Sequence, residues 1–326
     1  MTRSVLVSAG GDPFLLSFVV SLWRRYWYNE VDAMYVCYNS PMEKVVVDEL
    51  FKKLVGDKKL HLIYHPTGLG WGRPITEMVQ IAQEDLVMLL EDDGFIYTPG
   101  IVKEQFDLIE SGVTDAVGSP RFSCGMELAE AAMLKYGLDY SGEGDVGPHY
   151  WPNFFFAKRS DLLKTDLNFG SKSWQPGEYS KEVDHTFREV TSGDTFVWGC
   201  IQMRNNGVRF HHVRQHHASP NEIEEQKLGT VNWQKGNPPW LHGGSLSSGW
   251  TDNGFLRGGH TIPEDPGGRM ELETRCALWT LVSDAVTGFD GLRPAYKTGI
   301  EQLIGQGLNR GRINKKIEIY KGLMHI

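Results

Sequence analysis

Short apolar runs alternate with longer segments of helical spacing along the first hundred residues. The apolar runs have the length and composition of buried strands and lie at residues 4–9, 33–38, 60–64 and 86–90. The intervening segments have helix-length apolar content and lie at residues 14–28, 43–54 and 74–83. Strands that alternate with helices imply right-handed crossovers and a mostly parallel sheet. The pattern therefore predicts an α/β fold in which helices flank the sheet.

The remainder of the chain has a different pattern. A helix of about ten residues is expected to begin near Asp194 and to end at Asn206-Gly207, with a strand at residues 208–213. Residues 232–268 are rich in Gly, Pro, Ser and Trp and have little periodicity, which is typical of a functional loop. Helical spacing returns at residues 271–286 and 300–323. We therefore expect a loop-rich and then helical C-terminal part.

Composition narrows the protein class without defining a function. With 326 residues, 40% of them hydrophobic and 23% charged, the chain suits one large α/β domain or two smaller ones. No apolar run is long enough to span a membrane, and no signal-type leader is visible. The four cysteines are scattered, which argues against a disulfide framework or a zinc knuckle. A reducing, cytoplasmic location is expected.

Charge offers one candidate surface. The formal net charge of −8 gives no general attraction to nucleic acid, so such a partner would need a local basic patch. Basic residues crowd the C-terminal segment at Arg310, Arg312, Lys315, Lys316 and Lys321. A solvated helical face and a surface for a phosphate-rich partner both remain open.

The strongest chemical signal is the acidic triplet Glu91-Asp92-Asp93, which directly follows the fourth apolar run. Ligands of open α/β sheets bind at the carboxyl ends of the strands, so these acids are placed where a ligand would lie. Adjacent carboxylates repel one another unless a cation lies between them, and a divalent ion that carries a diphosphate meets this need. A solvated turn is the alternative, because acidic triplets also arise by chance.

A Gly-rich loop at residues 65–74 follows the third apolar run. Its glycines allow a ligand to approach the backbone, Pro74 suits the start of a helix, and Arg73 can reach a phosphate. The loop is neither a Walker loop nor a dinucleotide fingerprint, because it lacks the Gly-Lys-Ser/Thr ending and the Gly-x-Gly-x-x-Gly spacing. A plain connecting loop is the alternative.

Taken in order, these features resemble a nucleotide-sugar glycosyltransferase of the GT-A fold, of the family 2-like kind, with its DxD motif written here as Glu-Asp-Asp. The resemblance implies that Asp93 binds Mn²⁺ or Mg²⁺, and that Glu91 and Asp92 meet the metal or the ribose. It also implies a GT-A domain at residues 1–220, with a nucleotide-sugar-binding half at 1–100 and an acceptor half at 101–220. Residues 221–326 would then be a C-terminal extension.

The same resemblance implies further donor-binding residues. Ser8, Ala9 and Asp12, in the first strand and its turn, would lie near the base and the ribose. Arg73, at the start of the helix after the Gly-rich loop, would lie near the diphosphate.

The segment at residues 193–217 resembles the family pattern of an acid, a short helix, a Gly turn, a strand and a late histidine. The resemblance implies that Asp194 is the general base and that His216 or His217 completes the metal shell. Asp184 is the second candidate base. A plain helix cap is the alternative for Asp194, and the family pattern differs here because Gly193 replaces a carboxylate and the spacing from Gly207 to His216 is short.

Aromatic and histidine usage adds weaker candidates. His211 and His212 alternate on the expected strand, so only one of them can face a site. Trp151 and Trp174 flank an irregular stretch, where tryptophan suits sugar faces as well as cores.

The predicted function is metal-dependent transfer of a sugar from a nucleoside diphosphate to a hydroxyl acceptor, with inversion through an Asp base. The acceptor stays open among a glycan, a lipid-linked sugar, a small molecule and a hydroxylated nucleic-acid base. Two other classes remain: a sugar-phosphate nucleotidyltransferase and a non-catalytic carbohydrate-binding protein.

Overall fold

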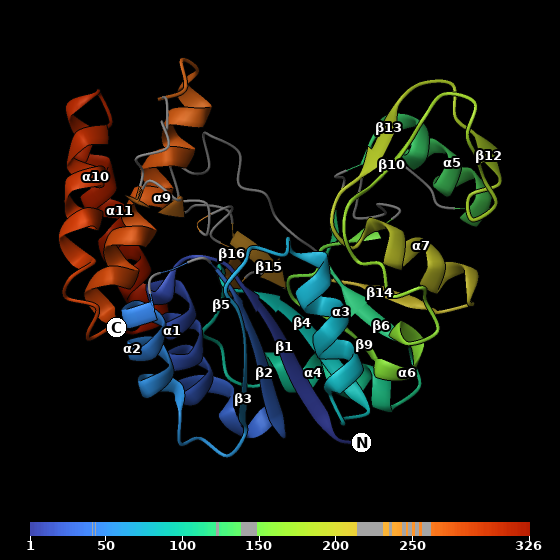
Figure 1. The fold of residues 1–326 in the computed structure, drawn as a ribbon, viewed down its shortest axis with the longest axis horizontal. Helices are drawn as coiled ribbons and strands as arrows, with labels where there is room; N and C mark the ends of the chain where they lie inside the picture. The colour runs from blue at the N-terminus through green and yellow to red at the C-terminus, as the bar shows by residue number, and fades with distance from the viewer. Residues whose placement is uncertain are drawn as a thin grey trace.

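A seven-stranded sheet forms the centre of the computed structural model (Figure 1). The structure describes residues 1–40, 42, 44–121, 124–137, 149–213, 231–234, 237–242, 246, 250–251, 254–255 and 262–326. The strand order is β14-β6-β9-β4-β1-β2-β3, and β9 alone in this sheet runs antiparallel to its neighbours. The bounds are β1 Arg3–Ala9, β2 Ala33–Asn39, β3 Leu60–His65, β4 Leu86–Glu91, β6 Ala116–Gly118, β9 Phe155–Lys158 and β14 Phe210–His212.

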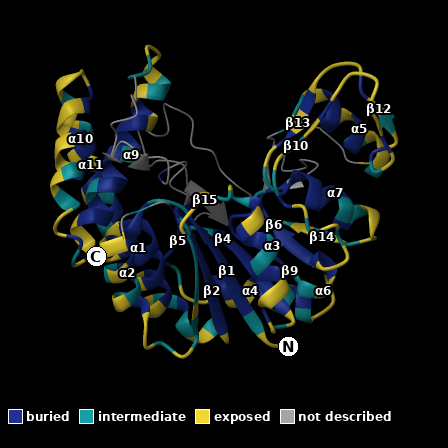
Figure 2. Cartoon of the chain, viewed as in Figure 1, coloured by how far each residue is buried: buried dark blue, intermediate teal, exposed yellow. Residues whose placement is uncertain are grey.

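Helices cover both faces of this sheet (Figure 1), and most of its strands are buried (Figure 2). The strands direct their side chains alternately into two cores. Val5, Val7 and Ala9 of β1 face one core, whereas Leu6 faces the other, as the two-residue period of a strand requires. The first core includes α1 Pro13–Leu22, α2 Lys44–Leu54 and α4 Ile101–Glu110. The second includes α3 Gly72–Ile81, α6 Arg159–Leu162 and α7 Val197–Asn205. The predicted α/β fold is confirmed.

A separate lobe rises beside α7 (Figure 1). It contains α5 Met126–Tyr136 and the short strands β10 Lys172–Trp174, β11 Tyr179–Ser180, β12 His185–Thr186 and β13 Thr191–Gly193. Trp174, Phe187 and Trp198 form its core together with the apolar face of α5. Trp174, a candidate sugar contact, is 1% exposed and therefore packs inside this lobe.

The C-terminal part is helical, as predicted. It contains α9 Pro266–Ala285, α10 Arg293–Gly305 and α11 Arg310–Met324. Before these helices, β16 Asn237–His242 pairs with β15 Val231–Gln234 and with β5 Gly94–Ile96, which directly follows the acidic triplet. Further short pairs are β7 Pro120–Arg121 with β8 His149–Tyr150, and β17 Trp250–Thr251 with β18 Gly254–Phe255. The C-terminal helices share one core with α1 and α2.

Several predicted boundaries differ from the structure, among them the start of the helix expected at residues 271–286, which lies at Pro266. The helix expected at residues 14–28 is regular only to Leu22 and continues as a π-helix at Trp23–Trp27 and a 3₁₀ turn at Tyr28–Glu30. The single helix expected at residues 300–323 is two helices, because Gly307 adopts a φ of 120° that ends α10. The strand expected at residues 208–213 is limited to Phe210–His212.

The basic C-terminal segment is tied into the fold through ion pairs. The Arg312 Nε atom lies 2.8 Å from the Glu273 carboxylate, which is 1% exposed, and Arg310 pairs with Glu301. Lys321 pairs with Glu318, and Lys316 is buried. Arg310 and Arg312 thus link α11 to α10 and α9, whereas Lys321 pairs within α11, which argues against a free basic patch. In the described part of the chain, no helix combines the length and apolar content that crossing a bilayer requires.

Candidate functional site at the carboxyl end of β4

The carboxyl ends of β1 and β4 lie side by side, with Ser8 paired in register with Glu91. The Gly10 amide in the turn after β1 donates to Asp92 Oδ2 at 2.9 Å. Trp71 of the Gly-rich loop packs against the same glycine, since a Cβ at Gly10 would lie 3.1 Å from the Trp71 Cη2 atom. The turn, the loop and the acids, which the sequence suggested separately, therefore meet at Gly10.

Each acid of the triplet contacts a different partner. Glu91 Oε2 accepts a hydrogen bond from Trp151 Nε1 at 3.1 Å, and Asp93 Oδ2 accepts one from the Leu246 amide at 3.3 Å. Asp92 and Asp93 are buried, whereas Glu91 is half-buried. Among the described side chains, the group of three whose ligand atoms lie within 4.8 Å of one another is Cys37, His65 and Glu77, rather than these acids. The triplet does not direct three carboxylates at one point.

The electrostatics of Asp92 favour a bound cation. Its pKa is raised well above the ordinary value, first by burial and then by the neighbouring charge of Asp93, while the Gly10 hydrogen bond opposes the shift. Asp92 Oδ1 is buried and has no hydrogen-bond partner among the described residues. A buried carboxylate oxygen without a partner is costly unless a proton or a cation reaches it. The residues present therefore fit a divalent ion.

Asp12, a predicted ribose contact, has its carboxylate engaged inside the fold. It is fully buried and caps α1, where Oδ1 accepts from the amides of Phe14 and Leu15 at 3.0 and 3.2 Å. Oδ2 accepts from the Tyr296 hydroxyl of α10. Burial raises the pKa of Asp12 to about 7.

Ser8 and Ala9, the other predicted nucleoside contacts, end β1. Both are buried, and Ala9 belongs to the core shared with α1. The Ser8 hydroxyl has no hydrogen-bond partner within the described residues.

Arg73 lies in the first turn of α3 and is exposed. This helix begins at Gly72 without a side-chain cap, so its first amides are not satisfied by a capping side chain. Glycine is required at its start, because a Cβ at Gly72 would lie 2.1 Å from the Gly170 amide nitrogen. Uncapped amides beside a guanidinium suit a phosphate. Pro74 occupies the third helical position rather than the first that the sequence suggested.

Asp194 precedes α7 but does not cap it, so the cap interpretation is wrong. The residue before the helix is Phe196, with a φ of 71°, and α7 has no side-chain cap. Asp194 Oδ1 instead accepts from the adjacent Thr195 amide at 2.7 Å, and the side chain is exposed. The predicted left-handed end of the helix is confirmed at Gly207, whose φ is 78°.

Asp184, the second candidate base, lies in the turn between β11 and β12 of the lobe. It is exposed, adopts a φ of 52°, and accepts a hydrogen bond from the Tyr179 hydroxyl at 2.7 Å. This carboxylate holds the tip of its own hairpin.

The histidine candidates divide into two groups. His216 and His217 lie outside the described residues. Of the pair on β14, His212 is half-buried and His211 is exposed, so the two do alternate. His212 Nδ1 lies 2.6 Å from the Tyr150 hydroxyl, and burial lowers the pKa of His212 to about 4, which keeps its ring neutral.

Several residues that shape the site carry no local sequence signal. Asn153 Oδ1 accepts from the Glu91 amide at 3.5 Å and lies so close to Gly94 that a Cβ there would be 2.3 Å away. Leu246, which donates to Asp93, accepts in turn from Trp279 Nε1 of α9 at 3.0 Å. Backbone contacts from distant segments cannot be read from a residue pattern. Trp151, suggested as a sugar contact, donates a hydrogen bond to Glu91.

Comparisons with known proteins show only limited similarity to this chain. No protein-family model matches the chain. No curated protein matches it in sequence.

Among solved structures, TarS of S. aureus is 15% identical over 52% of this chain and 30% of its own chain, with a TM-score of 0.36. Glucosyl-3-phosphoglycerate synthase of M. tuberculosis, in complex with Mn²⁺, UDP and phosphoglyceric acid, is 17% identical over 50% of this chain and 57% of its own, also with a TM-score of 0.36. The match spans less than two thirds of either protein.

Proposed function

We propose that this protein is a metal-dependent glycosyltransferase that moves a sugar from a nucleoside diphosphate to a hydroxyl acceptor. The observation that carries the proposal is the buried Oδ1 atom of Asp92, which has no hydrogen-bond partner among the described residues and lies where β4 ends next to the β1 turn. Donor sites of open α/β sheets occupy this position. The resemblance in sequence order to GT-A glycosyltransferases supports the same conclusion.

The acids would hold a divalent cation, Mn²⁺ or Mg²⁺, through Asp93 and Asp92, with Glu91 oriented by Trp151. Such ions keep water and substrate phosphate oxygens among their ligands, so two or three protein carboxylates with different partners suffice. The bound ion would supply counter-charge for the departing diphosphate. His216 and His217 remain candidate ligands from outside the described residues.

The donor would lie across the edge formed by β1, α3 and β4. We assign the nucleoside to the end of β1, where the Ser8 hydroxyl is unpaired among the described residues and Ala9 precedes the Gly10 turn. We assign the diphosphate to the space between the acids and the α3 start, where Arg73 and uncapped amides provide positive charge. Asp12 would support the donor site indirectly, by capping α1, because both of its carboxylate oxygens already accept hydrogen bonds within the protein.

Asp194 is our assignment for the general base. An inverting transfer needs a carboxylate that takes the proton from the acceptor hydroxyl as that oxygen attacks the anomeric carbon. Asp194 is exposed, and one of its oxygens is oriented by the Thr195 amide. Asp184 is less suited, because its carboxylate is bonded to Tyr179 at the tip of the lobe. The acceptor class stays open among a glycan, a lipid-linked sugar, a small metabolite and a hydroxylated base.

A donor screen tests this proposal. The melting temperature of the purified protein is measured with a panel of nucleoside diphosphate sugars, with and without Mn²⁺ or Mg²⁺. UDP-glucose and UDP-GlcNAc lead the panel, because they are bound in two of the similar structures. One donor should raise the melting temperature by about 3–6 °C at a hundred times its dissociation constant, and only with metal.

Two other outcomes would contradict the proposed glycosyltransferase activity. Absence of any metal-dependent shift would favour a non-catalytic carbohydrate-binding protein. Release of pyrophosphate from a nucleoside triphosphate plus a sugar phosphate would identify a nucleotidyltransferase instead.

A further inference from the structure

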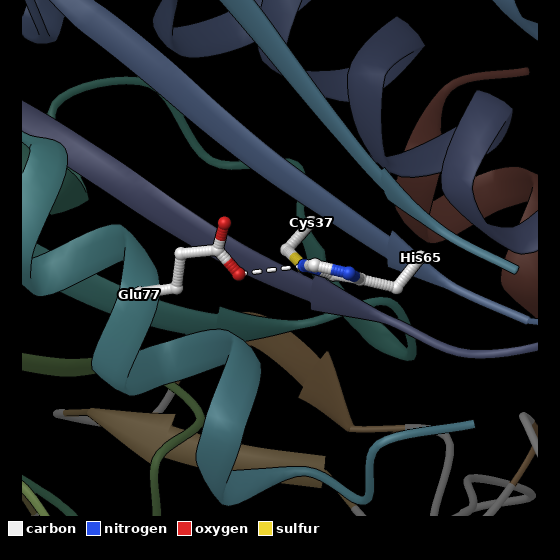
Figure 3. A group of neighbouring side chains, drawn as sticks. All are labelled: Cys37, His65 and Glu77. Carbon is white, nitrogen blue, oxygen red and sulfur yellow. Dashed lines mark hydrogen bonds and ion pairs between the residues drawn. The ribbon is translucent and has the colours of Figure 1, made fainter. Parts of the chain in front are cut away.

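A second group of metal-ligating side chains lies at the far edge of the sheet. Cys37 of β2 pairs in register with Ile63 of β3, and His65 stands two residues beyond Ile63. Residues two apart on a strand share a face, so Cys37 and His65 face the same side. Helix α3 packs on that face through its apolar side chains and adds Glu77. Figure 3 shows Glu77 directed from α3 at the His65 ring, with the Cys37 sulfur beside it.

The donor atoms are close and chemically mixed. The Cys37 sulfur, a His65 ring nitrogen and a Glu77 oxygen all lie within 4.8 Å of one another, and His65 Nε2 lies 2.6 Å from Glu77 Oε2. Cys37 is fully buried, whereas the side chains of His65 and Glu77 are 28% and 36% exposed. One ligand is therefore fixed in the core while the other two can adjust from the surface.

We propose that Cys37, His65 and Glu77 bind one borderline-soft divalent cation, of which Zn²⁺ is the chemical type, with solvent in a fourth position. Thiolate, imidazole and carboxylate are the ligands that zinc takes in proteins, whereas Mg²⁺ and Mn²⁺ prefer oxygen alone. This site is distinct from the all-oxygen acids at the end of β4. The inference does not depend on the proposed transferase activity.

Metal binding requires a small rearrangement. At metal–nitrogen and metal–oxygen distances of about 2.0–2.2 Å, tetrahedral ligand atoms stand about 3.3 Å apart, so the His65–Glu77 hydrogen bond must open. Both side chains are partly exposed and have room to do this. Burial raises the pKa of the Cys37 thiol to about 12 without an ion, so binding must release its proton.

The placement of the ligands suggests what the ion would do. His65 is the first residue of the Gly-rich loop at residues 65–74, and Glu77 follows this loop on α3, so one ion would join its two ends. Asn39 at the end of β2 already holds the middle of the loop, through the Leu69 amide at 2.7 Å and the Gly70 carbonyl at 3.2 Å. Metal binding would therefore reduce the freedom of the loop that carries Trp71 and leads into Arg73.

Cobalt titration of the metal-free protein tests the site, because a Co²⁺–thiolate bond gives a near-ultraviolet charge-transfer band that oxygen ligands do not. One Co²⁺ per chain should produce this band, and Zn²⁺ should displace it. Cys37→Ser should abolish the band, and His65→Gln and Glu77→Gln should each weaken binding at least about 10-fold. Cys276→Ser, a change at another buried free cysteine, is the matched control and should leave the band intact.

Two further measurements keep the test decisive. Asp93→Asn should leave the band unchanged, which separates this site from the β4 acids. Zn²⁺ at a hundred times its dissociation constant should raise the melting temperature of the wild type by about 3–6 °C, and that of Glu77→Gln by less. Absence of a thiolate band, or a band that survives in Cys37→Ser, would overturn the proposal. Near-ultraviolet circular dichroism measures whether each variant folds. If Cys37→Ser does not fold, His65→Gln and Glu77→Gln provide the test.

Discussion

The end of β4 and the lobe around β10–β13 both carry carboxylates, but they hold them in opposite environments. Asp92 and Asp93 are buried beside one another, and their partners come from the β1 turn and from Leu246. Asp184 and Asp194 are exposed, and their recorded partners lie within five residues in the chain. The first environment is built by distant segments, and the second by local ones.

This difference indicates different tasks. Like charges that are buried together destabilise the fold unless a proton or a cation offsets them, and the bound ion of our proposal would do so. An exposed carboxylate costs the fold little and can turn toward an incoming hydroxyl. In the proposed reaction, the acids at the end of β4 would hold the cation, and an exposed acid of the lobe would act as the general base.

The largest effect is expected from the β4 acids. Asp93→Asn keeps an oxygen for the Leu246 amide but removes the charge, so metal-dependent donor turnover should fall by about 10³-fold or more. Activity assays with Mn²⁺ measure this change. Wild-type turnover in Asp93→Asn would show that the cation does not bind at the end of β4.

The next effect separates the two acids of the lobe. Asp194→Asn should lower the transfer rate by about 10²–10³-fold while the donor still binds with unchanged affinity, because a base acts in the chemical step. Asp184→Asn is the matched control and should retain nearly the wild-type rate. Rates and donor affinities measured separately give the answer. If Asp184→Asn lowered the transfer rate more than Asp194→Asn, the general base would be Asp184 at the hairpin tip.

A smaller effect concerns pH. The pKa of Asp12 is about 7 in the fold, above its ordinary value of 3.8. The folded state therefore holds a proton that the unfolded chain releases, and stability falls as pH rises from about 4 to 7, by on the order of 3 kcal/mol. Asp12→Asn still caps α1 but cannot titrate, so its unfolding free energy should fall less over this window. Denaturant unfolding at several pH values measures the slope, and parallel slopes in both proteins would refute the assignment.

The smallest effect is expected at Trp151. Trp151→Phe keeps an aromatic ring but loses the Nε1–H that binds Glu91, so the Kd for Mn²⁺ should rise by about 10-fold with little change in the fold. Calorimetric titration of Mn²⁺ measures this change. Trp174→Phe, inside the lobe core, is the control and should leave the Mn²⁺ affinity unchanged. Equal affinities in the wild type and in Trp151→Phe would mean that Glu91 does not contact the ion.

The order of strands and helices in the first hundred residues could be predicted because each element carries its own apolar period. The neighbourhood of the acids at β4, the turn after β1 and the Gly-rich loop could also be anticipated, since carboxyl ends of parallel strands meet at one edge. Gly10, which contacts both Asp92 and Trp71, makes that edge compact.

What could not be predicted depends on contacts between distant segments. Nothing local in the sequence shows that Tyr296 would bind Asp12, or that Trp279 would support Leu246 at Asp93. The helix start near Asp194 was misplaced because Phe196 takes a left-handed backbone that its type rarely adopts. The Cys37 group has no sequence motif because its members lie on three different elements.

The pairing of β16 with β5 has a consequence for how the protein is made. β5 directly follows the acids, yet its partner strand begins only at Asn237, far along the chain. Translation delivers residues at about 5–20 per second, so the nascent N-terminal half waits several seconds with an open strand edge and an uncovered apolar face. A chain shortened near residue 220 should therefore be poorly soluble, and the need for chaperones should be greatest before the final helices emerge.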